Sequence, residues 1–189
     1  KKRVAYVGPV INKNLLKNRK LNRSQFTLGI QGGSQGSKEI NNLFYEYYTK
    51  NDMSEINILH ITGKGKELKK INDPNYSKYD FVDDMNTYYS KINLQISRSG
   101  GGSLEAAYLG IPQILIPYKH GTTSSHQLLN AEYLKKIGLA VIVNSYEELD
   151  KILNKIFNNL DNWKDLYFNE NIIESGNKKI TDMMLKEIN

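Results

Sequence analysis

Short apolar runs alternate with helical patterns along most of the chain, and this alternation constrains the fold more than any other feature. Strand-like runs are expected at 26–31, 56–61, 79–82, 94–97, 113–116 and 140–143. Helical patterns lie between and after them, at about 37–50, 64–71, 84–90, 103–109, 125–137 and 146–159. Strands that alternate with helices predict an α/β fold, a Rossmann-like doubly wound parallel sheet. Ligands of such sheets bind beyond the carboxyl ends of the strands.

The same pattern suggests how the 189 residues are organised. Residues 1–23 are expected to form an edge segment and linker, and residues 24–160 the sheet domain that binds a ligand. Residues 161–189 are expected to form terminal helices that pack on the same domain. This length is ample for one domain with a buried core.

Composition narrows the class of protein. The chain has no cysteine, which excludes a disulfide framework and a thiol nucleophile. It has no apolar run near the roughly 20 residues of a membrane span and no signal-peptide pattern, so a cytoplasmic location is expected. The net charge is +6, but lysines are scattered along the chain, so no nucleic acid partner is expected. A phosphate-bearing ligand or an anionic membrane surface fits this charge better.

A glycine-rich segment, "QGGSQGS", follows the first strand-like run. Its glycines let the backbone approach a ligand, and serine hydroxyls and helix-start amides donate to oxygen anions. Gly32, Gly33 and Gly36 do not follow the dinucleotide spacing G-x-G-x-x-G. The alternative is a plain turn, but three glycines with the two hydroxyls of Ser34 and Ser37 favour an anion-binding loop.

A second glycine-rich turn, "SRSGGGSLE", follows the fourth strand-like run. Successive amides at Gly101, Gly102 and Ser103 are expected to form another positive helix start. Two such turns in one sheet suit a ligand with two phosphates. Glu105 falls in the first helical turn, where it either complements the helix dipole or accepts hydrogen bonds from a ribose diol. The chemistry alone leaves both interpretations open.

A third polar segment follows the fifth strand-like run. His126, Gln127 and Asn130 are donors and acceptors suited to sugar hydroxyls. Gln127 also fits a capping box with Ser124, which would make it a purely structural residue.

The remaining titratable groups indicate structure rather than chemistry. Asp83 and Asp84 open a helical pattern, which favours N-capping over metal binding or acid–base work. His60 ends a strand-like run and is expected to be a hydrogen-bonded core or rim histidine. No residue cluster suggests a metal site, and no metal or other cofactor is expected.

Several motifs occur together and in order. "GGSQGSKEIN", "HITGKGKEL" and "YDFVDDMNTYYSKINLQISRSGGGSLEAAYLGIPQILIPYKHGTTSSHQLLNAEYL" resemble the C-terminal half of the MurG-like GlcNAc transferase family. The resemblance runs from about residue 32 to 140, and more weakly to the end. It implies one half of a GT-B fold, in which two Rossmann-like domains face each other across a cleft. The implied function is donor binding in the transfer of GlcNAc from UDP-GlcNAc to a polyprenyl-linked acceptor, in cell envelope glycan biosynthesis.

The resemblance also implies roles for residues of the glycine-rich turns. Ser34, with Gly33 and Gln35 beside it, corresponds to the loop near the donor phosphates. Gly101 and Gly102 correspond to the turn whose amides hold a phosphate.

Further roles concern the base and the sugars. The backbone of Val82 corresponds to the position that meets the uracil edge, and Glu105 to the glutamate that binds ribose. His126 and Gln127 correspond to the positions that contact the sugar hydroxyls, with Asn130 just behind them.

The chain departs from the family pattern in three ways. The spacing from Arg98 to Glu105 is one residue shorter, and Ile11 stands where the family has an arginine that contacts the diphosphate. The acceptor-binding N-terminal half is missing, so no catalytic residue is assigned and the chain alone is expected to be inactive. The lipid-linked acceptor would be bound by that missing domain or by a partner subunit. The alternatives are a UDP-GlcNAc 2-epimerase-like enzyme and a non-catalytic nucleotide-sugar-binding subunit.

Overall fold

The computed structural model describes residues 8–12, 14–15, 25–66, 69–118 and 124–188. In these ranges six parallel strands form one sheet, in the order β3-β2-β1-β4-β5-β6. The strands are β1 (Thr27–Gln31), β2 (Asn57–Ile61), β3 (Tyr76–Tyr79), β4 (Leu94–Ser97), β5 (Gln113–Leu115) and β6 (Ala140–Ile142). The expected Rossmann-like doubly wound sheet is confirmed. Its strand order reverses direction between β1 and β4, which is where such sheets bind ligands.

Three of the described helices begin at a side-chain N-cap. The helices are α1 (Lys38–Lys50), α2 (Met85–Lys91), α3 (Gly101–Tyr108), α4 (Ser124–Lys136), α5 (Tyr146–Phe157) and α6 (Asn177–Ile188), with a 3-10 turn at Trp163–Leu166. The side chains of Ser37, Asp84 and Ser145 accept hydrogen bonds from the first turns of α1, α2 and α5. The N-capping prediction for Asp84 is therefore confirmed.

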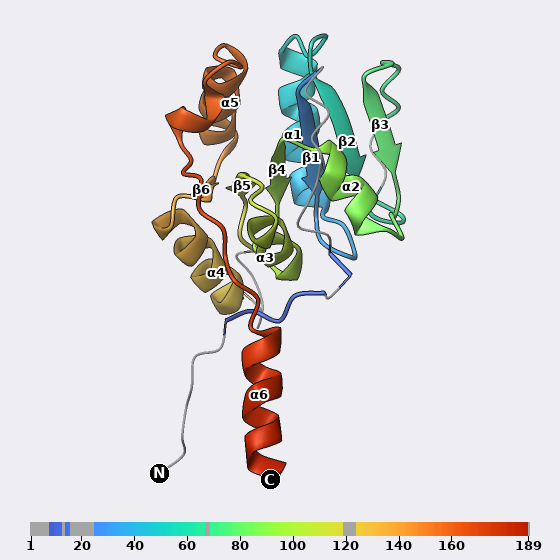
Figure 1. Cartoon of the computed structure of the whole chain (residues 1–189). Coiled ribbons are helices and arrows are strands. Elements are labelled where there is room, and N and C mark those ends of the chain that lie inside the picture. Colours follow the sequence, from blue (N-terminus) through green and yellow to red (C-terminus); the bar gives the residue numbers. More distant parts are fainter. Residues whose placement is uncertain (1–7, 13, 16–24, 67–68, 119–123, 189) are drawn as a thin grey trace.

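Helices cover both faces of the sheet (Figure 1). On one face, Leu28 and Ile30 of β1 belong to a core cluster with residues of α1 and α5. On the other face, α2 and α3 pack around Tyr88 and Ile92. Gly29 allows α2 to pack closely on β1, because a Cβ at this position would lie 2.5 Å from the Tyr88 hydroxyl. Each buried aliphatic side chain contributes about 1.5–3 kcal/mol to this packing.

An aromatic cluster closes the amino end of β1. The ring of Phe26 lies 5.1 Å from that of Trp163 and 5.8 Å from that of Phe157, both edge to face. Trp163 in turn meets Phe168 at 5.9 Å. These contacts attach the segment after α5 to the start of the sheet.

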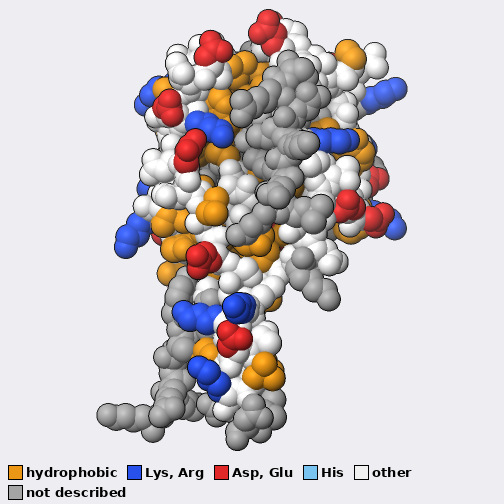
Figure 2. Space-filling view, in the orientation of Figure 1, with side chains coloured by type: hydrophobic (Ala, Val, Ile, Leu, Met, Phe, Trp, Pro, Cys, Tyr) orange, Lys and Arg blue, Asp and Glu red, His pale blue; other side chains and the backbone are white. Residues whose placement is uncertain are grey.

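The C-terminal region has two different parts. Trp163 and Ile173 are buried, so the segment around them packs on the body as expected. Helix α6 instead extends away from the body (Figure 1) and exposes Met183, Met184 and Leu185. Figure 2 shows basic and apolar side chains together on this projecting part. The expected packing on the body is thus not found for α6.

Two predicted elements are wrong. The edge strand β3 is Tyr76–Tyr79 rather than 79–82, because an edge strand half-exposed to solvent carries polar residues and shows no apolar run. The helix expected at 64–71 is a turn at Lys64 and Gly65 in the residues described there, because Gly63 and Gly65 adopt positive φ. Residues 67–68 lie outside the described part.

No helix of the described ranges has the length and apolar character needed to cross a membrane.

Candidate functional site

A cavity of about 1000 Å³ opens at the carboxyl ends of β1 and β4. Residues 31–39 line one side, and residues of the turn after β4 with the start of α3 line the other. The segment around Val82, together with Tyr118 and Gln127, completes the wall. The cavity therefore lies at the switch point of the sheet, and its size suits a ligand such as a nucleotide sugar.

The loop after β1 is held by the segment that follows β2. Gly36 has φ of +68°, and a Cβ there would lie 2.2 Å from the Thr62 carbonyl oxygen. The Lys66 ammonium donates to the carbonyl oxygens of Gln35 (2.6 Å) and Gly36 (2.9 Å). Gly33, at φ +84°, has open space where a Cβ would stand. One side of this loop is thus fixed by the close packing at Gly36 and by the Lys66 side chain, while Gly33 stays open to the cavity.

His60 supports this loop from within the core. Asn41 Nδ2 donates to the carbonyls of Thr62 and Lys66, both at 2.9 Å, which leaves Asn41 Oδ1 to accept from His60 Nε2 at 3.0 Å. His60 Nδ1 then accepts from the Tyr76 hydroxyl at 2.6 Å. Burial, with a smaller effect of the Lys78 charge, lowers the pKa of His60 to about 3. The expected structural role of His60 is confirmed.

Helix α3 begins at Gly101, two residues earlier than expected, so Gly101 and Gly102 form its first turn. A Cβ at Gly100 or Gly101 would meet nothing within 4 Å, so the helix start is open to the cavity. Ser103 is placed differently from the expectation, because it is fully buried. Its hydroxyl donates to the Gly100 carbonyl at 2.7 Å, and its amide donates to the same oxygen at 3.1 Å.

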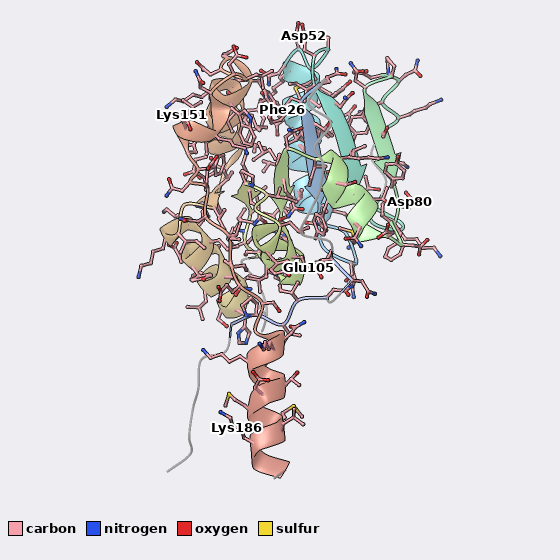
Figure 3. The ribbon with its side chains drawn as sticks, viewed as in Figure 1. Phe26, Asp52, Asp80, Glu105, Lys151 and Lys186 are labelled. Atoms are coloured by element: carbon pink, nitrogen blue, oxygen red, sulfur yellow. The ribbon has the colours of Figure 1, made fainter. Side chains whose placement is uncertain are left out.

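Glu105 lies in the first turns of α3 (Figure 3), and it lines the cavity. Its Oε2 accepts a hydrogen bond from the Tyr89 hydroxyl at 3.1 Å, and the same hydroxyl lies 3.2 Å from the Gly102 carbonyl oxygen. Burial, and then the Glu105 charge, raise the pKa of Tyr89 far above its usual range. Tyr89 therefore stays protonated and donates to the carboxylate.

Arg98 joins the two sides of the cavity, although sequence reasoning gave it no role. It is buried, and it donates to Ser37 Oγ and to the Ile116 carbonyl, each at 2.9 Å. It also pairs with Glu39, and its guanidinium lies 5.3 Å from the centre of the Tyr118 ring. An arginine directly after the fully buried strand β4 was the only signal for this role.

The three residues expected to contact sugar hydroxyls occupy different environments on α4. Gln127 lines the cavity, and its Oε1 accepts from the Tyr118 amide at 3.0 Å. Asn130 Nδ2 donates to the Ser99 carbonyl at 3.0 Å, which attaches α4 to the turn before α3. His126 is exposed and lies outside the cavity lining. Gln127 alone of the three reaches the cavity wall.

The remaining residues selected from the sequence lie partly at the cavity wall and partly in the core. Val82 and Asp83 line the cavity beside the exposed ring of Phe81. Ile11 is 3% exposed and belongs to the core cluster with Tyr88, not to the cavity wall. Among the residues that the structure describes, no three or more histidine and acidic side chains are grouped as metal ligands.

The strand order and the switch-point cavity between two glycine-rich turns define a Rossmann-like ligand-binding domain. The chain belongs to glycosyltransferase family 28, because residues 27–184 match the family's C-terminal domain.

Comparison with known proteins agrees. The chain is similar to the UDP-N-acetylglucosamine–N-acetylmuramyl-(pentapeptide) pyrophosphoryl-undecaprenol N-acetylglucosamine transferase of Thermotoga sp. (strain RQ2). Identity is 31% over 161 residues, covering 84% of this chain and 46% of the relative. The enzyme of the same name from Prochlorococcus marinus (strain NATL1A) is 34% identical over 137 residues, covering 69% of this chain and 39% of that relative. The chain thus spans less than half the length of these relatives.

Solved structures show the same likeness. Acinetobacter baumannii MurG matches with a TM-score of 0.61 and 27% identity, covering 77% of this chain and 43% of MurG. The expected resemblance to the C-terminal half of MurG-like transferases is confirmed. UDP-GlcNAc 2-epimerase from Neisseria meningitidis matches with a TM-score of 0.55 and 15% identity, covering 87% of this chain and 45% of the epimerase. That second match shows a shared fold alone.

Proposed function

We propose that this chain is the donor-binding half of a UDP-GlcNAc-dependent glycosyltransferase. The observation that carries the proposal is the cavity between two glycine-rich helix starts, within a family 28 C-terminal domain. The acceptor, a lipid-linked sugar, would bind to a further domain or to a partner subunit. The net charge of +6 would favour peripheral contact with an anionic membrane surface on the cytoplasmic side.

The proposed reaction is an in-line displacement with inversion. An acceptor hydroxyl attacks the anomeric carbon, the bond from that carbon to the UDP oxygen breaks, and UDP leaves. The hydroxyl proton passes to a base outside this chain. Amides at the start of α3 and in the loop after β1 would stabilise the negative charge that develops on the diphosphate.

Cavity residues supply the rest of donor recognition. The Val82 backbone would meet the uracil edge, Glu105 would accept from the ribose hydroxyls, and Gln127 would contact the sugar. These three residues come from different segments and line one cavity, as a single extended ligand requires.

The epimerase interpretation has weaker support. Its structural match shows the fold alone, while the family match is to a glycosyltransferase domain and the curated relatives are named GlcNAc transferases. Incubating the complete two-domain protein with UDP-GlcNAc but no acceptor separates the two functions, because only an epimerase would convert the free nucleotide sugar.

The chain is expected to bind UDP and UDP-GlcNAc without a divalent metal, because helix-start amides supply the positive field at the diphosphate. Isothermal titration calorimetry in the presence of a chelator measures this directly. Binding that appears only after addition of Mg²⁺ or Mn²⁺ contradicts the metal-free proposal. An absence of binding under both conditions contradicts the proposed function itself.

Substitution Glu105→Ala is expected to weaken UDP binding by about 1–3 kcal/mol, because the ribose hydroxyls lose a charged acceptor. The fold should change little, since the Tyr89 hydroxyl keeps the Gly102 carbonyl as a second acceptor. Titration of UDP against 2′,3′-dideoxy-UDP reads out the ribose contact. The wild type should prefer UDP, and the variant should not. An unchanged preference would make Glu105 a helix-dipole residue only.

A further inference from the structure

Three glutamine side chains form a buried polar row across the sheet. Gln31 of β1 is 6% exposed, while Gln95 of β4 and Gln113 of β5 are fully buried. Gln31 Nε2 donates to Gln95 Oε1 at 2.9 Å, and Gln95 Nε2 donates to Gln113 Oε1 at 3.1 Å. Gln113 Nε2 donates to the backbone carbonyl of Ser103 at 2.9 Å. The row therefore links three strands to the first turn of α3.

The direction of this row is fixed at its end. A backbone carbonyl only accepts, so Gln113 must turn its amide nitrogen toward Ser103. Gln113 Oε1 then accepts from Gln95, and Gln95 Oε1 accepts from Gln31. The second hydrogen of Gln31 Nε2, which the bond to Gln95 does not use, lies at the rim of the cavity and is the free end of the row.

That free end meets Tyr89. The Gln31 side chain hydrogen-bonds the Tyr89 hydroxyl. An oxygen that accepts from Gln31 directs its own single hydrogen elsewhere, and its neighbours on α3 are Glu105 Oε2 and the Gly102 carbonyl. The row thus starts at Ser103 and returns through Tyr89 to Glu105, two residues further along the same helix.

We infer that Tyr89, oriented by Gln31 and the glutamine row, is a positioning residue that holds the Glu105 carboxylate toward the ribose of a bound uridine nucleotide. This inference rests on the proposed function. A carboxylate with one oxygen fixed by Tyr89 keeps the remaining lone pairs for the two ribose hydroxyls. An alternative role for Tyr89 is packing, since its ring is 1% exposed.

The test is Tyr89→Phe, which removes the hydroxyl and keeps the ring. UDP affinity, measured by calorimetry, is expected to fall about tenfold, the usual effect of losing a hydrogen bond to a charged group. The preference for UDP over 2′,3′-dideoxy-UDP should fall with it. In the double variant Tyr89→Phe with Glu105→Ala, the loss should equal that of Glu105→Ala alone, because Tyr89 acts only through that carboxylate.

Tyr47→Phe is the matched control. Tyr47 is also 1% exposed, and its hydroxyl donates to Asn154 Oδ1 at 2.8 Å on the opposite face of the sheet. This variant should bind both nucleotides as the wild type does. If Tyr89→Phe binds UDP as tightly as Tyr47→Phe does, or if its effect adds fully to that of Glu105→Ala, the positioning role is overturned. If the wild type does not bind UDP, the proposed function fails instead.

Discussion

These 189 residues alone are expected to transfer no measurable GlcNAc to a polyprenyl-linked acceptor. Transfer requires donor, acceptor and base in near-attack geometry, and such proximity supplies up to about 7–11 kcal/mol of the barrier. The proposed site would hold the donor only. The chain also spans less than half the length of its transferase relatives. The assay is radiolabelled UDP-GlcNAc with a polyprenyl-linked acceptor, with extraction of the lipid product.

Addition of the acceptor-binding half, on the same polypeptide or as a separate chain, is expected to restore transfer. A Glu105→Ala version of the restored enzyme controls for contaminating activity, because its donor affinity should be reduced. Robust turnover by the 189 residues alone would mean that a base lies within them. Asp83, which lines the cavity, and His126, which is exposed on α4, would then be the first residues to substitute.

Gly36→Ala is expected to destabilise the fold and abolish most UDP binding. A left-handed backbone costs a non-glycine residue about 1–2 kcal/mol, and forcing atoms into a packed region costs about 1–3 kcal/mol. The added Cβ would lie 2.2 Å from the Thr62 carbonyl oxygen and 2.5 Å from Gly63 Cα, both backbone atoms. At about 2–4 °C per kcal/mol, the melting temperature should fall by about 5–15 °C. Differential scanning calorimetry measures this shift.

Gly65→Ala isolates the cause of this effect. Gly65 has φ of +69°, almost equal to that of Gly36, but a Cβ there would meet nothing within 4 Å. The Gly65 variant should therefore lose only the stability that a left-handed backbone costs a non-glycine residue, and it should bind UDP normally. Equal melting temperatures for the two variants would show that the contact between the two loops is unimportant.

The sequence was sufficient to predict the architecture and the edge of the sheet that carries the cavity. Alternating elements dictate a parallel sheet, and both glycine-rich turns directly follow strands, so they must meet at the carboxyl edge. Glu105 was selected because it lies in the first turn of the helix after the second glycine-rich turn, and Val82 through the family resemblance; both line the cavity. The structure leaves their proposed contacts with a nucleotide to experiment.

What the sequence could not show depends on contacts between distant segments. Gln95 and Gln113 become neighbours only through the register of β4 and β5. Lys66 is unremarkable in the sequence until its loop folds against Gly36. Ser103 carries the right chemistry for a helix start, but α3 begins two residues earlier than the pattern suggested and turns it inward.

The two ends of β1 contribute to different parts of the domain, one to its packing and the other to its cavity. Phe26 marks the aromatic cluster at its amino end, and Glu105 the cavity beyond its carboxyl end (Figure 3). A strand of five residues separates them by about 17 Å at 3.3 Å per residue. Substitutions at such a distance combine almost independently. Evolution could therefore change the thermal stability of this domain through the aromatic cluster without changing the ligand preference set by the cavity.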